Sequence, residues 1–179
     1  MNEFATFQGI IIGLLSGIVS SILSTMIIRF IRPRIIISDK IARAGSSEKP
    51  EYRLKFVNLS KSYAKNVRVT AQLINRQNAA DGGTLITTRP LQFIRTDFGF
   101  IEPYNKADTE NRYAVRLKFK DPLEELWDDP TYTSLEIAIY CENETSGVGK
   151  VFKKVYYSRS CISNGFYETG KSVNLILDS

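Results

Sequence analysis

The 179-residue sequence contains no histidine. Without an imidazole, the chain has no Ser-His or Cys-His nucleophile, no histidine-ligated metal and no side chain whose unperturbed pKa lies near neutrality. It also has no G-x-S-x-G nucleophile elbow and no H-E-x-x-H zinc motif. We therefore expect a protein that is not an enzyme, with no catalytic residue, no metal site and no cofactor.

Cysteine is also scarce, with Cys141 and Cys161 as the two examples. Two cysteines do not make a disulfide framework, they lack the ligand spacing of a zinc site, and no base is present to activate them. We expect two reduced, partly buried thiols, with a single bridge as the alternative.

Three further patterns are too incomplete to indicate a ligand. The stretch GVGK at 147–150 lacks the leading glycine and the Ser or Thr of a phosphate-binding loop, so we interpret it as a hairpin turn. The acidic residues of 121–129 lack the spacing and the central glycine of a calcium loop, so we interpret them as a solvated face. The net charge of +5 is modest and no stacking motif accompanies a basic stripe, which argues against nucleic acid as a partner.

The sequence does contain a long apolar run, from Phe7 to Ile28, without a charged residue. A helix of this length spans about 33 Å, close to the ~30 Å hydrocarbon thickness of a bilayer. A signal peptide would need a basic segment before the run and a small-x-small cleavage site after it, and the sequence has neither. The run therefore predicts a transmembrane helix within residues 1–31, and Pro33 predicts that the helix ends soon after it.

Basic residues follow this helix but do not precede it. The positive-inside rule therefore predicts a single-pass protein of the plasma (inner) membrane, with a short outer tail, a basic linker at 32–36 and a cytoplasmic domain at 32–179. The same residues would meet the anionic inner leaflet, so they serve either for topology alone or also for contact with anionic lipid. They are Arg29, Arg32, Arg34 and Lys40.

One stripe of the predicted helix has almost no side chains. Gly9, Gly13, Gly17 and Ser21 recur every four residues and so lie on one face. Small-xxx-small spacing lets helix backbones approach closely in lipid. We expect these four residues to form a helix-packing face, either between copies of this chain or against another membrane protein.

After Pro33 the hydrophobic pattern alternates with a period of two. Half-buried strands are predicted around 52–56, 67–73, 113–119 and 135–141, with shorter ones at 35–40, 84–88, 91–95, 149–157 and 172–177. One short helix is predicted at 121–130, with Leu123 and Trp127 packed inward. The fold class predicted is mainly β: a single N-terminal transmembrane helix followed by an antiparallel β-sandwich.

Two blocks of this domain resemble the cytoplasmic domain of inward-rectifier potassium channels. The first is ISDKIA at 37–42, followed by YRLKFVNLSKSYAKNVRVTAQLI at 52–74, and the second is EIAIYCENETSGVGKVFKKVYYSRSCISNGF at 136–166. The matching positions are Ser38, Asp39, Lys40, Asn58, Leu59, Ala71, Gln72, Leu73, Glu136, Ile137, Glu142, Ser146, Gly147, Tyr156, Ile162, Gly165 and Phe166. Segment 78–112 matches loosely.

The resemblance implies an immunoglobulin-like sandwich, assembly as a tetramer below the membrane and binding of anionic lipid at the linker. This chain has no T-x-G-Y-G pore loop and no second membrane helix, and Asn164 stands where the family has a tryptophan. The resemblance therefore does not imply potassium conduction.

Two functions fit these patterns. In the first, the helices form a homo-oligomer, and the cytoplasmic domain senses a ligand or partner, with the assembly acting as a membrane effector or pore. In the second, the protein is an anchored accessory or scaffold that docks a partner at the inner membrane face. The effector function is the favoured hypothesis, and no motif identifies its ligand or protein partner.

Overall fold

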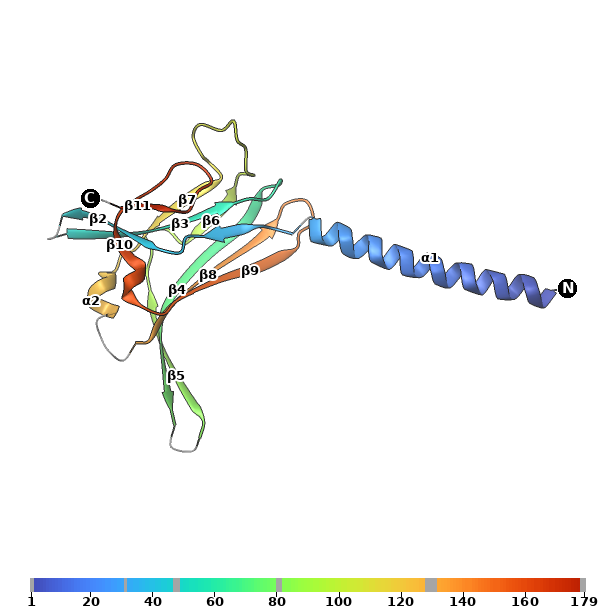
Figure 1. The fold of residues 1–179 in the computed structure, drawn as a ribbon, viewed down its shortest axis with the longest axis horizontal. Helices are drawn as coiled ribbons and strands as arrows, with labels where there is room; N and C mark the ends of the chain where they lie inside the picture. The colour runs from blue at the N-terminus through green and yellow to red at the C-terminus, as the bar shows by residue number, and fades with distance from the viewer. Residues whose placement is uncertain (1, 31, 47–48, 80–81, 128–131, 178–179) are drawn as a thin grey trace.

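The computed structural model describes residues 2–30, 32–46, 49–79, 82–127 and 132–177 (Figure 1). The chain is mainly β, with one apolar helix at its N-terminus, as predicted. The elements in chain order are α1 (Asn2–Phe30), β1 (Ile35–Ile37), β2 (Ile41–Ser46), β3 (Lys49–Asn58), β4 (Ala64–Asn78), β5 (Thr84–Leu91), β6 (Asp97–Ile101), β7 (Ala114–Lys118), α2 (Leu123–Trp127), β8 (Ser134–Asn143), β9 (Gly149–Tyr156), a 3-10 turn (Arg159–Cys161), β10 (Ile162–Tyr167) and β11 (Leu175–Leu177).

Helix α1 extends away from the strands as a single rod (Figure 1). Every side chain from Gln8 to Ile27 is exposed, and this segment is long and apolar enough to cross a membrane by length and composition. The helix ends at Phe30, shortly before Pro33, as the position of that proline predicted.

The strands form two sheets. One has the order β1-β3-β2-β10-β11, with β7 on the other side of β3. The other has the order β5-β4-β8-β9, with β6 also paired to β4. Buried side chains of both sheets form one hydrophobic cluster, which includes Ile41, Leu54, Phe56, Val67, Val69, Leu73, Leu135, Ile137 and Ile139.

The prediction of a wholly antiparallel domain is wrong at one pair, because β10 runs parallel to β2 in the register Ile162 to Ile41. The preceding strand, β9, belongs to the other sheet, so the chain crosses between sheets through the 3-10 turn. Hairpin geometry imposes antiparallel pairing, and it does not apply to a crossover.

The alternating pattern located the long strands but missed β2, β6 and β10. The prediction at 91–95 is also wrong, since β5 ends at Leu91 and Phe93 makes an isolated bridge to Phe119. The predicted strand at 172–177 is confined to β11. The short helix is confirmed as α2, and Leu123 and Trp127 are buried as expected.

Lys55 is an exception to the alternation of exposed and buried side chains predicted for β3. The pattern placed its side chain in water, but the residue is 1% exposed. Its Nζ donates to the carbonyl oxygens of Glu168 at 2.6 Å, Gly170 at 2.8 Å and Ser172 at 2.6 Å. The C-terminal segment therefore folds over this face of β3, and the ammonium holds it there.

We expect Lys55→Met to destabilise the domain and to loosen residues 168–172, since three carbonyls lose their shared donor. Hydrogen exchange should become faster in this segment, while the exposed Lys153→Met serves as the control. Unchanged exchange would contradict the role assigned to Lys55.

The effect of Lys55→Met on the free energy of unfolding should depend on pH. Burial lowers the pKa of Lys55 from 10.5 to about 8. Between these values the unfolded chain binds more protons than the folded one, so this group makes the free energy of unfolding rise with pH. The difference between wild type and Lys55→Met in denaturant unfolding should therefore change in favour of the wild type from about pH 7 to about pH 9.5.

Candidate functional site

The glycine stripe lies on an unoccupied face of α1. A Cβ placed on Gly9, Gly13 or Gly17 would meet no atom within 4 Å, and Ser21 is exposed. Two hydroxyls of α1 turn back to their own backbone, because Ser16 Oγ donates to the carbonyl of Gly13 and Thr25 Oγ1 to that of Ser21, each at 2.9 Å. The small residues therefore remain open to a partner.

The predicted basic residues do not all lie together. Arg29 falls in α1, where its side chain is outside the described residues, and Arg32 and Arg34 are exposed just beyond the helix. Lys40 lies beyond β1, immediately before β2. Measured along β3 at ~3.3 Å per residue, the start of β2 is about 17 Å from the start of β1. The structure thus groups the arginines with the helix end and separates Lys40 from them.

The two thiols are free, with Cys141 buried and Cys161 partly buried. Burial raises the pKa of Cys141 to about 12 and that of Cys161 to about 11. Both thiols are therefore protonated at neutral pH and are poor nucleophiles or metal ligands.

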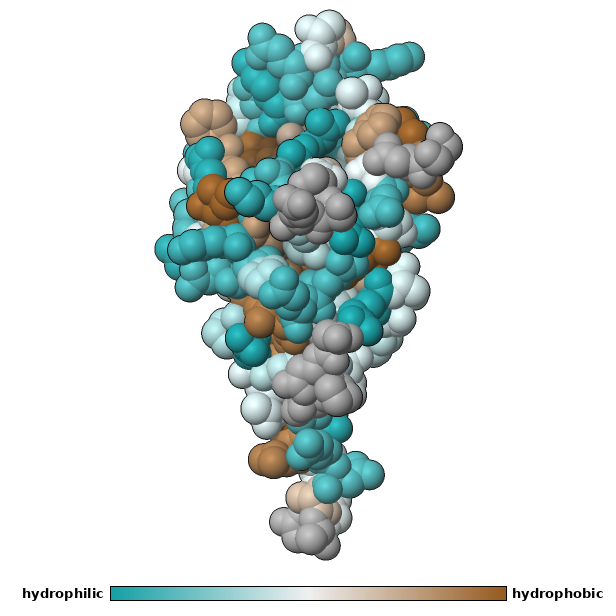
Figure 2. Space-filling model, turned by 90° about the vertical axis from the view of Figure 1, so that its left-hand side faces the viewer, coloured by the Kyte–Doolittle hydropathy of each residue, from teal (hydrophilic) through white to brown (hydrophobic). Residues whose placement is uncertain are grey.

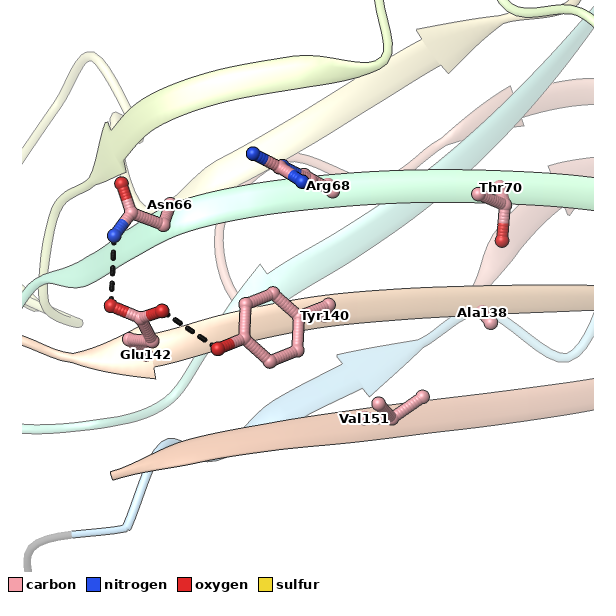
Figure 3. Close-up of a pocket in the computed structure, with 7 residues that line it drawn as sticks. All are labelled: Asn66, Arg68, Thr70, Ala138, Tyr140, Glu142 and Val151. Carbon is pink, nitrogen blue, oxygen red and sulfur yellow. Dashed lines mark hydrogen bonds between the residues drawn. The ribbon is translucent and has the colours of Figure 1, made fainter. Parts of the chain in front are cut away.

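A hollow that no sequence motif indicated opens on the outer face of the β5-β4-β8-β9 sheet (Figure 3). Its volume is about 670 Å³. Three neighbouring strands supply its lining: Asn66, Arg68 and Thr70 from β4, Ala138, Tyr140 and Glu142 from β8, and Val151 from β9. The small side chains of Thr70 and Ala138 leave the space that the larger ones surround.

The carboxylate of Glu142 organises one end of the hollow. It accepts a hydrogen bond from Tyr140 Oη at 2.6 Å and another from Asn66 Nδ2 at 2.8 Å (Figure 3). The bond from Tyr140, followed by that from Asn66, lowers the pKa of Glu142, and the same bond to Glu142 raises the pKa of Tyr140. These bonds fix the ring and the amide that border the hollow.

Two backbone features make this arrangement possible. The pairing of β4 with β8 shifts between Lys65 and Arg68, and Asn66 at this bulge has a positive φ of 50°. Asparagine tolerates this left-handed conformation better than most residues. On β9, a Cβ on Gly149 would lie 2.7 Å from Tyr140 Oη, so the absence of a side chain lets the ring lie across that strand.

Arg68 brings a cation to the rim. Its side chain is 75% exposed, and its Nε lies 3.8 Å from an Asp97 carboxylate oxygen, at the outer limit of an ion pair. It extends along β4 toward Asn66, above the ring of Tyr140 (Figure 3). The hollow therefore offers a guanidinium, an aromatic ring and an amide to a polar, planar group.

Two buried asparagines connect the residue that follows Glu142 to the linker after α1. Asn143, the residue after Glu142, donates to Ser62 Oγ and accepts from the backbone N–H of Thr145 and Ser146. Asn58 donates to the carbonyl of Ser62 at 3.2 Å.

The second half of this connection reaches the linker. Asn58 Oδ1 accepts from the backbone N–H of Ser60 at 3.0 Å, and Ser60 Oγ accepts from that of Arg34 at 2.9 Å. The carbonyl of Arg34 in turn accepts from Leu59 N at 2.7 Å. An unbroken run of contacts therefore joins the residue next to the hollow to the linker that follows α1.

We expect Tyr140→Phe to raise the pKa of Glu142 toward its ordinary value, because the strongest hydrogen bond to the carboxylate is lost. In the wild type, the lowered pKa means that both bonds persist at neutral pH and are lost as the pH falls through that value. Carboxyl NMR titration measures the change. Thr70→Val, at the opposite end of the hollow, is the control, and an unshifted Glu142 in Tyr140→Phe would contradict the geometry.

No family model matches this chain, and no curated protein matches it. A solved structure, the X-ray structure of Northeast Structural Genomics Consortium target SoR45, is 16% identical, with 69% of this chain and 83% of that chain covered and a TM-score of 0.29. A TM-score of this size does not establish a shared fold. The function of the chain therefore has to be argued from its own residues.

Proposed function

We propose that this protein is a non-enzymatic, single-pass membrane protein. In this proposal α1 assembles with copies of itself, and residues 32–179 form an immunoglobulin-like β-sandwich that senses a ligand or partner on the cytoplasmic side. The observation that carries it is the run of hydrogen bonds from Asn143, beside the hollow, to Arg34 in the linker. A binding event on the sheet would thereby have a route to the linker that follows the helix.

The membrane assignment has two supports. The exposed apolar segment from Gln8 to Ile27 is not covered by any of the described residues, which is costly in water and favourable in a bilayer. The arginines at its C-terminal end support a domain at the inner face of the plasma membrane, where each contact with an anionic lipid headgroup would be worth about 1 kcal/mol.

The assembly has separate supports. The stripe of Gly9, Gly13, Gly17 and Ser21 is open to close backbone approach. The resemblance to the inward-rectifier cytoplasmic domain favours a tetramer and supports the sandwich, as does the single hydrophobic cluster shared by the two sheets. In such a bundle, a rearranged linker would change how the helices pack, and this gives the protein the layout of a membrane effector.

We expect Gly13→Ile and Gly17→Ile to lower the oligomeric state of the full chain in detergent, because a branched side chain keeps the helix backbones apart. Light scattering coupled to gel filtration gives the mass. Leu15→Ile, on the opposite face of α1, is the matched control and should keep the wild-type mass. A wild-type mass in both glycine variants would reject the stripe as the interface.

A second experiment separates an effector from a scaffold. Purified protein in dye-loaded liposomes should release dye when the small-molecule fraction of a cell extract is added. Asn143→Ala should lose this response because it breaks the connection to the linker. The exposed Asn164→Ala should keep it, and fluorescence of Trp127 checks that both variants fold.

Protein that never releases dye, with or without extract, would favour the scaffold function instead. Release that is unaffected by Asn143→Ala would contradict the proposed route from the sheet to α1.

A further inference from the structure

A β-hairpin arm projects from the domain without covering any part of it. The arm comprises residues 76–90 of β4, β5 and the turn between them, of which 76–79 and 82–90 are described. Each described residue of the arm is exposed, except the half-buried Ala79. In Figures 1 and 2 the arm extends below the body, and Figure 2 shows hydrophobic surface on it.

The arm lacks the support that the rest of the sheet has. Pairing of β8 with β4 stops at Ile74, opposite Ser134, whereas β5 continues along β4 to Asn78, opposite Thr84. Beyond Ile74 the arm is thus a two-stranded ribbon, and a ribbon of two strands is marginal in water on its own. Its apolar side chains, Leu85 and Ile86, are 58% and 56% exposed.

The outer edge of β5 is built to pair with another strand. Thr84, Ile86, Thr87 and Thr88 favour extended structure, and Arg89 is the single charged residue of the strand. Natural sheets protect free edges with lysine, proline or short strands. Apart from Pro90 at its base, β5 has none of these.

The opposite edge of the same sheet shows the contrast. Strand β9 carries three lysines, Lys150, Lys153 and Lys154, and these blunt that edge against pairing. Lys150 would also repel Arg76 and Arg89 of the arm, whereas Lys153 and Lys154 are paired with Glu136 and Asp39. The charges therefore disfavour a β5 to β9 contact between copies and leave β5 as its own partner.

We propose that β5 of one copy pairs antiparallel with β5 of a second copy, which joins the two arms into a four-stranded ribbon. The arm lies across the direction of α1 (Figure 1). A two-fold axis parallel to α1 keeps both helices pointing the same way and reverses the direction of the arm, as antiparallel pairing requires. The inference rests on the proposed function in one respect, that copies share a membrane orientation.

The sequence of the strand suits this self-contact. Pairing centred on Ile86 places the exposed Ile86 side chains of the two copies opposite each other on one face, where each shields the other from water. In this arrangement each Arg89 lies near the far end of the other strand. The two cations are then about 20 Å apart, which is beyond the ~8 Å screening length at physiological salt.

Cross-linking of the full chain in detergent tests the proposal. Thr87→Cys, treated with a short bis-maleimide that tolerates a one-residue shift in register, should give a covalent dimer. Thr70→Cys, an exposed position on the same sheet, is the matched control, and the wild type reports any background from Cys161. Adding Ile86→Lys to Thr87→Cys should reduce the dimer to the Thr70→Cys level, whereas adding Ile86→Val should keep it.

Cross-linking of Thr87→Cys at no more than the Thr70→Cys level would overturn the proposal. So would a cross-linked product in native membranes whose mass is not that of two copies. Neither result bears on self-association of α1, which is tested separately by the masses of the Gly13→Ile and Gly17→Ile variants. Conversely, an arm dimer that persists in those helix variants supports the arm contact even if the stripe is rejected.

Discussion

Two buried amide side chains hold the end of the domain next to α1. Asn58 is 0% exposed and Asn143 is 2% exposed. Together they satisfy backbone groups of three loops that would otherwise lose their hydrogen bonds on burial: Asn58 donates to the carbonyls of Ser62, Ile101 and Glu102, and Asn143 accepts from Thr145 and Ser146. These contacts hold the linker at Arg34 to the loops beside the hollow.

Lys55 does the same for the C-terminal end of the chain. Its ammonium is buried against three carbonyl oxygens, and Arg116 adds a bond to the carbonyl of Tyr167 at 3.2 Å. A buried cation is tolerated when its donors are all used. The segment between β10 and β11 is thereby fixed over β3.

The hollow arises from departures from a regular sheet. A bulge turns Asn66 toward Glu142, a missing side chain at Gly149 admits the ring of Tyr140, and small residues leave the centre open. The arm is the second irregularity, because it is a pair of strands that extends beyond the end of the neighbouring strand. Both features cost local stability, and both lie where the proposed function needs a contact, one for a ligand and one for another copy.

The sequence by itself determined the apolar N-terminal helix, the β character of the remainder and the inward faces of β3, β4, β7 and β8. These follow from hydrophobic periodicity, which is local. A doubled polar pair, Lys65 and Asn66, also interrupts the alternation of β4 and was the one sequence trace of the bulge. Glycine spacing marked one stripe of α1 with almost no side chains.

Tertiary structure alone decided the rest, because each remaining feature joins residues far apart in the chain. The burial of Lys55 depends on a segment more than a hundred residues later. The parallel pair of β10 and β2 depends on a crossover between sheets, and the hollow depends on the register of three strands. Local periodicity tells which face of a strand is apolar, but long-range packing decides what covers the polar one.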